Sequence, residues 1–269
     1  MTIKNLILLL SATAITACSD IDSDERYIVA DSVAPQRCVL VEDFTGQNCV
    51  NCPKAHETLE NIVAQYGDAV IPVSIHAGGF GIAATNTRYT GLMQPEGNTY
   101  NDAWGIDEWP KGVVNRSGGA LNHDKWAEAV RTEIAKPSAL EIKIAAEVPA
   151  GSDEIAITTT LEPDSYIEGK LQLWVIESGI VARQEDKDLG RIEDYVHNNV
   201  YRASVNGVGG EDVTLQANIH STLSHSITLR ATPTETWVPE NLDIVAFVYD
   251  NSGVLQASRS KVTIENEEN

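Results

Sequence analysis

The chain has 269 residues and a formal net charge of −20 at pH 7. A charge of this sign argues against nucleic acid as a partner and against direct docking on anionic lipid. The length is sufficient for two domains of ordinary size, each with its own hydrophobic core.

The first 17 residues have the order of a bacterial export signal, with a basic residue, an apolar run and a small residue directly before Cys18. The apolar run is too short to be a stable membrane anchor. We therefore predict a signal peptide over residues 1–17. Its end, Ile15-Thr16-Ala17-Cys18, resembles the lipobox, which implies cleavage before Cys18 and a membrane anchor through lipid on that residue. An ordinary secretory signal with a chance cysteine is the alternative.

Residues 18–34 are predicted to be an acidic, solvated tether. The run from Ser19 to Glu25 resembles the surface-export signal of Bacteroidota lipoproteins, which implies display on the cell surface. The periplasmic face of the membrane is the alternative. Asp31-Ser32-Val33 resembles the O-glycosylation triplet of these bacteria, and the sequence leaves open whether Ser32 is modified.

Residues 35–137 alternate between strand and helix patterns, which predicts an α/β layer structure. Pro72 lies within one expected strand and favours an irregular edge position for it. The expected strands are 39–41, 69–75 and 111–115, and the expected helices are 53–66, 99–104 and the segment after Asn122.

Cys49 and Cys52 form a CxxC motif where the first helix is expected to begin, a position suited to thiol–disulfide chemistry. In an exported chain the expected resting state of the pair is a disulfide. Cys38 is left over and is expected to be a small buried hydrophobic residue.

Two further stretches are similar to thioredoxins over residues 35–136. Asp43-Phe44 precede the CxxC by the thioredoxin interval, and the sequence around Trp109-Pro110 resembles the thioredoxin approach to its cis-proline. The resemblance implies that Pro110 is cis and lies beside the CxxC, and that Asp43 shuttles a proton. It also implies that Cys49, the more exposed thiol, attacks a substrate disulfide and that Cys52 resolves it.

Three residues depart from the active thioredoxin pattern. Pro53 makes Cys52 the expected helix cap, which leaves Cys49 further from the helix dipole. Asn48 replaces a docking tryptophan, and Trp109 replaces a smaller residue before the cis-proline. These departures favour a non-catalytic role, with thiol–disulfide oxidoreductase as the alternative.

A zinc site is the other chemical alternative, with Cys49, Cys52, His56 and His76 as formal ligands. An oxidised pair cannot supply thiolates, and His56 is expected on a solvated helix face. We therefore expect no metal and no cofactor.

Residues 138–269 contain short segments rich in β-branched residues, separated by turns. They predict an all-β domain with an immunoglobulin-like sandwich topology. Residues 191–206 fit neither the helix period nor the strand period and are predicted to be a long polar insertion, a kind of segment that often binds ligands.

Taken together, four features resemble the twenty-eight-kilodalton outer-membrane lipoprotein family of Bacteroidota. They are the lipobox, the acidic tether, the run from Glu42 to Gln47 before the CxxC-Pro, and the run from Asp194 to Asn198. The resemblance implies an outer-membrane location and no settled activity. We expect a thioredoxin-like domain followed by a β-sandwich, with a binding or structural role toward a protein or glycan ligand.

Overall fold

The computed structural model describes residues 36–265. The predicted signal peptide, the tether, the lipidation site at Cys18 and Ser32 lie outside these residues. Within the described range, each helix is too short or too polar to cross a membrane.

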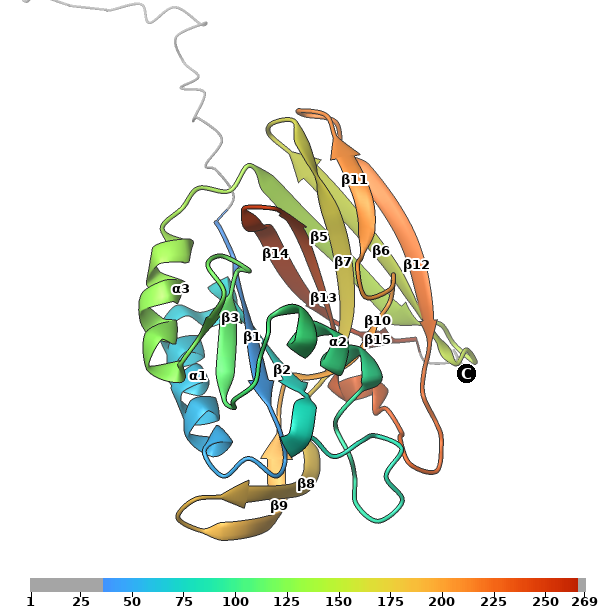
Figure 1. Cartoon of the computed structure of the whole chain (residues 1–269). Coiled ribbons are helices and arrows are strands. Elements are labelled where there is room, and N and C mark those ends of the chain that lie inside the picture. The colour runs from blue at the N-terminus through green and yellow to red at the C-terminus, as the bar shows by residue number, and fades with distance from the viewer. Residues whose placement is uncertain (1–35, 266–269) are drawn as a thin grey trace, which may run out of the picture. The chain divides into compact units, whose positions relative to one another are not determined.

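A nine-stranded sheet runs through the structure in the order β14-β13-β7-β10-β2-β1-β3-β4, with β11 also paired to β7 (Figure 1). Its strands β1 and β2 are parallel and buried along their whole length. Burial on both faces explains their nearly continuous apolar character. The strands are β1 (Val39–Thr45), β2 (Val70–His76), β3 (Lys111–Val114), β4 (Ala120–Leu121), β7 (Ile167–Glu177), β10 (Val200–Ser204), β11 (Glu211–Leu215), β13 (Leu242–Asp250) and β14 (Gly253–Lys261).

Helices α1 (Cys52–Tyr66) and α3 (Trp126–Ile134) pack on one side of the sheet beside β1 and β3 (Figure 1). Their apolar stripes share a core cluster with Val39 and Val41. Helix α1 begins one residue before the predicted start, with Pro53 in the first turn, where a missing N–H costs no helical hydrogen bond. Helix α2 (Pro95–Ala103) starts earlier than predicted, also on a proline. Short 3₁₀ turns lie at η2 (Gly67–Ala69), η3 (Gly78–Phe80), η4 (His123–Lys125) and η5 (Pro239–Asn241).

A four-stranded sheet, in the order β12-β6-β5-β15, forms a further layer. Side chains from this sheet and from β7 and β13 of the large sheet meet in common cores. The strands are β5 (Leu140–Val148), β6 (Glu154–Pro163), β12 (Ser221–Thr228) and β15 (Thr263–Ile264). The described chain is thus mostly β-structure with few helices.

The predicted boundary at residue 137 falls between α3 and β5, and the large sheet continues across it. Strand β10, from the second segment, pairs with β2, from the first, at Val200 and Ser74. The two segments therefore share a sheet, and the division of the chain into domains 35–137 and 138–269 stays a prediction.

The predicted polar insertion over residues 191–206 is wrong. Strands β8 (Ile180–Asp186) and β9 (Gly190–His197) form a separate two-stranded hairpin, and β10 follows at once. Charged residues at three of the eight positions of β9 (Arg191, Glu193 and Asp194) hide its strand period, because much of that strand faces solvent. We call residues 180–197 the β8–β9 hairpin.

The prediction of an edge position for the strand that contains Pro72 is also wrong, because β2 lies between β1 and β10. The Ser74 N–H donates to the carbonyl of Asn199, so it points toward β10. Pro72, two residues earlier, has its nitrogen on the same side. Because β10 pairs with β2 only at Ser74, the missing N–H of Pro72 breaks no ladder bond.

A buried ion pair between Arg116 and Glu42 lies against the large sheet. The Arg116 Nε donates to the Glu42 Oε1 at 2.7 Å, and the Glu42 side chain is fully buried. The guanidinium of Arg116 also lies 4.7 Å from the ring centroid of Phe247 and 4.6 Å from that of Tyr249. Burial of the arginine therefore depends on one carboxylate and a set of aromatic faces.

We expect Glu42→Gln to lower the free energy of unfolding by about 3–5 kcal/mol, because it leaves the buried Arg116 without a counter-charge. Urea denaturation measures the change. Glu57→Gln, at the exposed pair with Lys54, is the matched control and should cost at most about 1 kcal/mol. Equal losses in the two variants would contradict the role of the buried pair.

Candidate functional site

The CxxC lies in the turn that connects β1 to α1 and forms the predicted disulfide between Cys49 and Cys52, with the two Cα atoms 5.4 Å apart. Cys49 is 2% exposed and Cys52 is fully buried. Cys49 is the more exposed of the two, as expected, but its sulfur is still almost inaccessible to solvent. Cys38 is a free cysteine, partly buried against the core, and burial raises its pKa.

The β8–β9 hairpin is hydrogen-bonded to the CxxC loop, at the end of the molecule where α1 begins (Figure 1). The Gln184 Nε2 donates to the carbonyl oxygens of Gly46 and Cys49, at 3.2 and 3.0 Å. The Glu185 N–H donates to the Gln47 carbonyl at 2.8 Å. Contacts to three successive parts of the loop hold the hairpin in place, and the cysteines beside it are buried.

Gln47, part of the motif before the CxxC, is fully buried and ties the loop to two other segments. Its Nε2 donates to the carbonyls of Thr90 and Arg183, and its Oε1 accepts from the N–H of Leu92. Asn48 accepts a hydrogen bond from Arg183 through its Oδ1. Both side chains therefore form hydrogen bonds within the protein.

Pro110 follows a cis peptide bond, as predicted. The preceding Trp109 packs edge-on against Phe80, with 5.6 Å between ring centroids, and lies over Gly78. A Cβ at Gly78 would approach the Trp109 ring to 2.1 Å, and its φ of +64° also favours glycine. The packing of Trp109 therefore requires a glycine at this position.

Trp109 and Pro110 line an open groove of about 880 Å³, together with the start of α1 and the tip of the β8–β9 hairpin. Val50, Asn51 and Pro53 belong to its wall, whereas neither Cys49 nor Cys52 does. A molecule in this groove meets the surface of the loop and not the sulfur atoms.

Asp43, in β1, is fully buried, and desolvation raises its pKa to about 8. The His56 Nε2 lies 3.5 Å from the Asp43 Oδ2, and burial, together with the nearby His197, lowers the His56 pKa to about 3. Both groups are therefore uncharged at neutral pH, and their contact is not an ion pair.

His56 is not on a solvated face, contrary to the sequence-based expectation. Its two ring nitrogens lie 2.9 Å from the Thr45 hydroxyl and 2.9 Å from the Tyr195 hydroxyl, which the hairpin supplies. His197, also from the hairpin, lies against Tyr195 and His76, with ring centroids 4.8 and 5.3 Å apart. No local pattern signals this cluster, because more than 100 residues separate Thr45, His56 and His76 from Tyr195 and His197.

The zinc alternative does not match this geometry. The two sulfur atoms are bonded to each other and supply no thiolate. Among residues 36–265, no group of three or more histidine, cysteine or acidic side chains is arranged to hold a metal ion.

We expect Asp43→Asn to be more stable than the native chain at pH 8 and to differ much less at pH 5. The folded state keeps the Asp43 proton up to about pH 8, whereas the unfolded chain loses it near pH 4. Native stability therefore falls between these values as the pH rises, by up to about 1.4 kcal/mol per pH unit. Asparagine has no proton to lose, so the variant lacks this fall.

Urea denaturation across this pH range measures the effect. Asp188→Asn, at the exposed tip of the β8–β9 hairpin, is the matched control and should keep the native pH profile. Parallel profiles for the native chain and Asp43→Asn would show that Asp43 is ionised in the folded state.

Comparison with known proteins identifies relatives. HBP35 of Porphyromonas gingivalis has a similar structure, with a TM-score of 0.65 and 16% identity, over 87% of this chain and 78% of that one. A structural-genomics protein of Agrobacterium tumefaciens matches with a TM-score of 0.50 and 15% identity, over 88% of this chain and 98% of that one. These likenesses concern the fold alone.

A domain of the outer membrane lipoprotein Omp28 of Porphyromonas gingivalis is 21% identical over 48% of this chain and 92% of that domain, with a TM-score of 0.35. A search of the curated proteins found no match. The model of the family described as outer membrane protein Omp28 matches residues 97–266, which is more than half of the sequence. The chain therefore belongs to the Omp28 family of outer membrane proteins.

Proposed function

We propose that the protein is a lipid-anchored binding protein of the outer membrane, displayed on the cell surface, in which the Cys49–Cys52 disulfide is structural. The observation that carries the non-catalytic part is the burial of both sulfurs beside a hydrogen-bonded hairpin. A thiol–disulfide oxidoreductase needs an accessible attacking sulfur. Anchoring through Cys18 rests on the lipobox, and surface display rests on the acidic tether.

We also infer a thioredoxin-like arrangement for the first segment and an immunoglobulin-like sandwich for the second. The first inference is supported by the parallel pair β1–β2, by α1 directly after the CxxC, and by the antiparallel β3 that follows the cis-proline. The second is supported by the core shared between the four-stranded sheet and strands β7 and β13.

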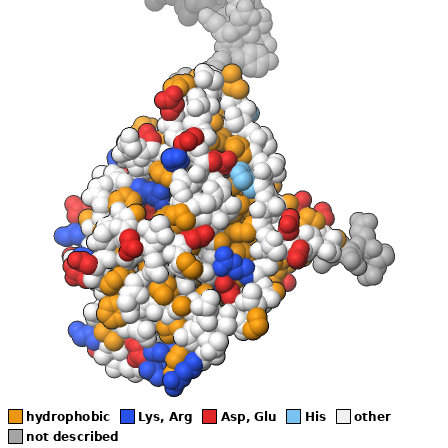
Figure 2. All heavy atoms as spheres, turned by 45° about the vertical axis from the view of Figure 1, so that its right-hand side comes forward, with side chains coloured by type: hydrophobic (Ala, Val, Ile, Leu, Met, Phe, Trp, Pro, Cys, Tyr) orange, Lys and Arg blue, Asp and Glu red, His pale blue; other side chains and the backbone are white. Residues whose placement is uncertain are grey.

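A protein or glycan ligand is our proposal for the partner. The groove beside Trp109 combines an aromatic ring with charged side chains of both signs, such as Lys54, Asp124 and Lys187. Elsewhere, the face drawn in Figure 2 interleaves acidic, basic and apolar side chains. A mixed surface of this kind suits a polar partner better than a strongly charged polymer.

Two features favour the oxidoreductase as a second candidate. The buried Asp43 is held protonated, and Pro110 is cis, as the resemblance to thioredoxins implies. For this chemistry the β8–β9 hairpin must first move off the loop, and the hydrogen bonds of Gln184 oppose that movement.

Trapping in cells separates the two candidates. Cys52→Ser leaves Cys49 as the single thiol of the pair, so a working oxidoreductase would accumulate as mixed disulfides with its substrates. We expect no such adducts on non-reducing gels, at the level of the Cys49→Ser/Cys52→Ser control. Adducts that depend on Cys49 would overturn the non-catalytic proposal.

We expect Gln184→Ala to speed reduction of the disulfide by dithiothreitol about tenfold, because the loss of about 1.4 kcal/mol of hairpin docking exposes the sulfurs ten times more often. Lys187→Ala, at the exposed hairpin tip, is the control and should be reduced at the native rate. The rate is followed by alkylation of the released thiols. An unchanged rate in Gln184→Ala would mean that the hairpin does not protect the disulfide.

A further inference from the structure

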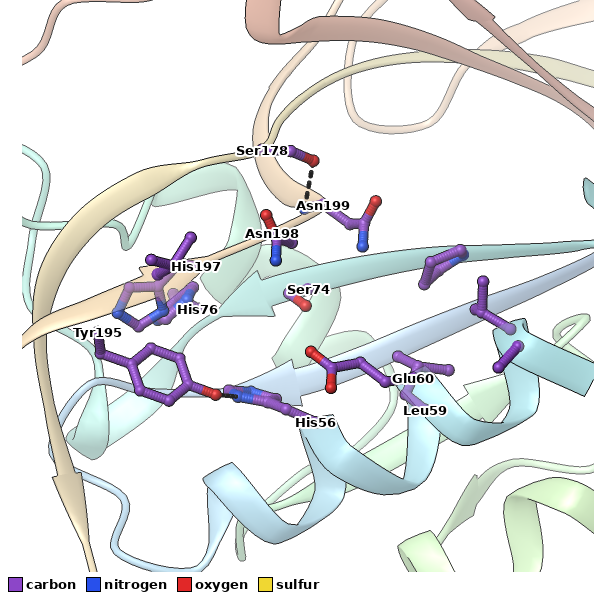
Figure 3. A pocket seen from close by; sticks show the side chains of 14 residues that line it. His56, Leu59, Glu60, Ser74, His76, Ser178, Tyr195, His197, Asn198 and Asn199 are labelled. Atoms are coloured by element: carbon purple, nitrogen blue, oxygen red, sulfur yellow. Dashed lines mark hydrogen bonds between the residues drawn. The ribbon is translucent and has the colours of Figure 1, made fainter. Parts of the chain in front are cut away.

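A second cavity, of about 410 Å³, lies between α1, β2 and the segment that joins β9 to β10 (Figure 3). Its volume is within the usual range for small-molecule sites. It is separate from the groove beside Trp109, with which it shares no lining residue. The function proposed above makes no use of it.

The cavity exists because β10 pairs with β2 at a single residue. Pro72, Ser74 and His76 alternate along β2 and line the cavity together, as the two-residue period of a strand requires. Apart from the pairing at Ser74, no strand in the described part of the chain covers this edge of β2. Leu59 and Val63 of α1 supply the opposite, apolar wall.

The inner end of the cavity carries polar groups without partners. His76 is 2% exposed, and neither of its ring nitrogens has a hydrogen-bond partner. The Nε2 of His197, whose ring lies beside that of His76 in Figure 3, is also without one. Buried polar atoms are normally paired, so three unpaired nitrogens at one end of a cavity indicate a place for a ligand's polar group.

The charges around the cavity favour an uncharged ligand. Burial, together with the nearby His197, His56 and Arg202, lowers the pKa of His76, and burial lowers the pKa of His197 to about 4, so neither histidine offers a counter-charge to an anion at neutral pH. Glu60, exposed at the mouth, is the single acidic or basic residue apart from histidine and tyrosine in the lining. A neutral imidazole can both donate and accept a hydrogen bond.

We propose that this cavity binds a small uncharged molecule with an apolar body and a hydroxyl, ketone or amide group that meets His76 and His197. Leu59, Val63 and Pro72 contact the body, and the exposed residues Ala64 and Val196 belong to the rim of the cavity. The inference rests on the proposed binding role and adds the class of ligand.

The test uses the mature chain, residues 18–269, with Cys18→Ser to keep lipid off. The probe is 6-propionyl-2-dimethylaminonaphthalene, an uncharged naphthalene with a ketone, whose emission shifts to the blue in an apolar site. We expect saturable binding, at least about tenfold tighter than that of the anionic 1-anilinonaphthalene-8-sulfonate. Absence of saturable binding, or equal binding of the anion, would overturn the proposal.

Substitutions at two exposed positions on α1 test whether the probe binds in the cavity. Ala64→Trp places a large ring at the rim of the cavity and should weaken binding at least about tenfold, whereas Gln65→Trp, the next residue and not part of the lining, should leave it unchanged. Because both positions are exposed, both variants should fold. Equal affinities in the two variants would place the probe elsewhere and overturn the proposal.

His76→Phe tests the polar end. The native chain should prefer the ketone probe over 2-dimethylaminonaphthalene, which lacks the ketone, by about fivefold to tenfold, the value of one hydrogen bond. The variant should lose this preference while still binding the apolar body. A merely structural role for His76 would weaken both probes equally. The assay does not involve the sulfurs, so trapped adducts of Cys52→Ser would refute the non-catalytic role without refuting the cavity.

Discussion

Two buried glutamine side chains connect the CxxC loop to the β8–β9 hairpin, and the properties of the site depend on this connection. Gln184 donates from the hairpin to two carbonyls of the loop, and Gln47 donates from the loop to a carbonyl of the hairpin. A buried amide that loses its partners leaves several polar groups unsatisfied at once. The hairpin is therefore held more firmly than its exposed, charged outer surface suggests, and the disulfide beside it is buried.

The uncharged polar cluster that contacts the β8–β9 hairpin is a consequence of the same closure. Asp43, His56, His76 and His197 are buried together, and desolvation acts on each of them in favour of its neutral form. In an open site the carboxyl group and the imidazoles would regain water and their ordinary titration. The protonation state of Asp43 thus depends less on its neighbours in sequence than on the exclusion of solvent by the hairpin.

The features that could be predicted from the sequence are those encoded by residues close together in the chain. The apolar period predicted the helix after Cys52, and the resemblance to thioredoxins pointed to Asp43 and implied the cis bond before Pro110. The hairpin was missed because its contacts join Gln184 to residues 135 or more positions away, and because its charged residues resemble a loop. The prediction of an edge strand from Pro72 was wrong for a physical reason as well. A proline is tolerated in this central strand because β10 pairs with β2 only at Ser74 and leaves Pro72 without a partner. No local sequence pattern encodes that gap in the pairing.

The β8–β9 hairpin also couples two features that lie in different places. Gln184, in β8, lies against the CxxC loop, whereas Tyr195 and His197, in β9, line the cavity beside α1. A movement that exposes the sulfurs therefore also removes a wall of the cavity. By linkage, a molecule that binds the closed cavity stabilises the closed hairpin and lowers the accessibility of the disulfide. The burial of Cys49 and the shape of the cavity are two consequences of one docked element, and an effect on either one should be detectable at the other.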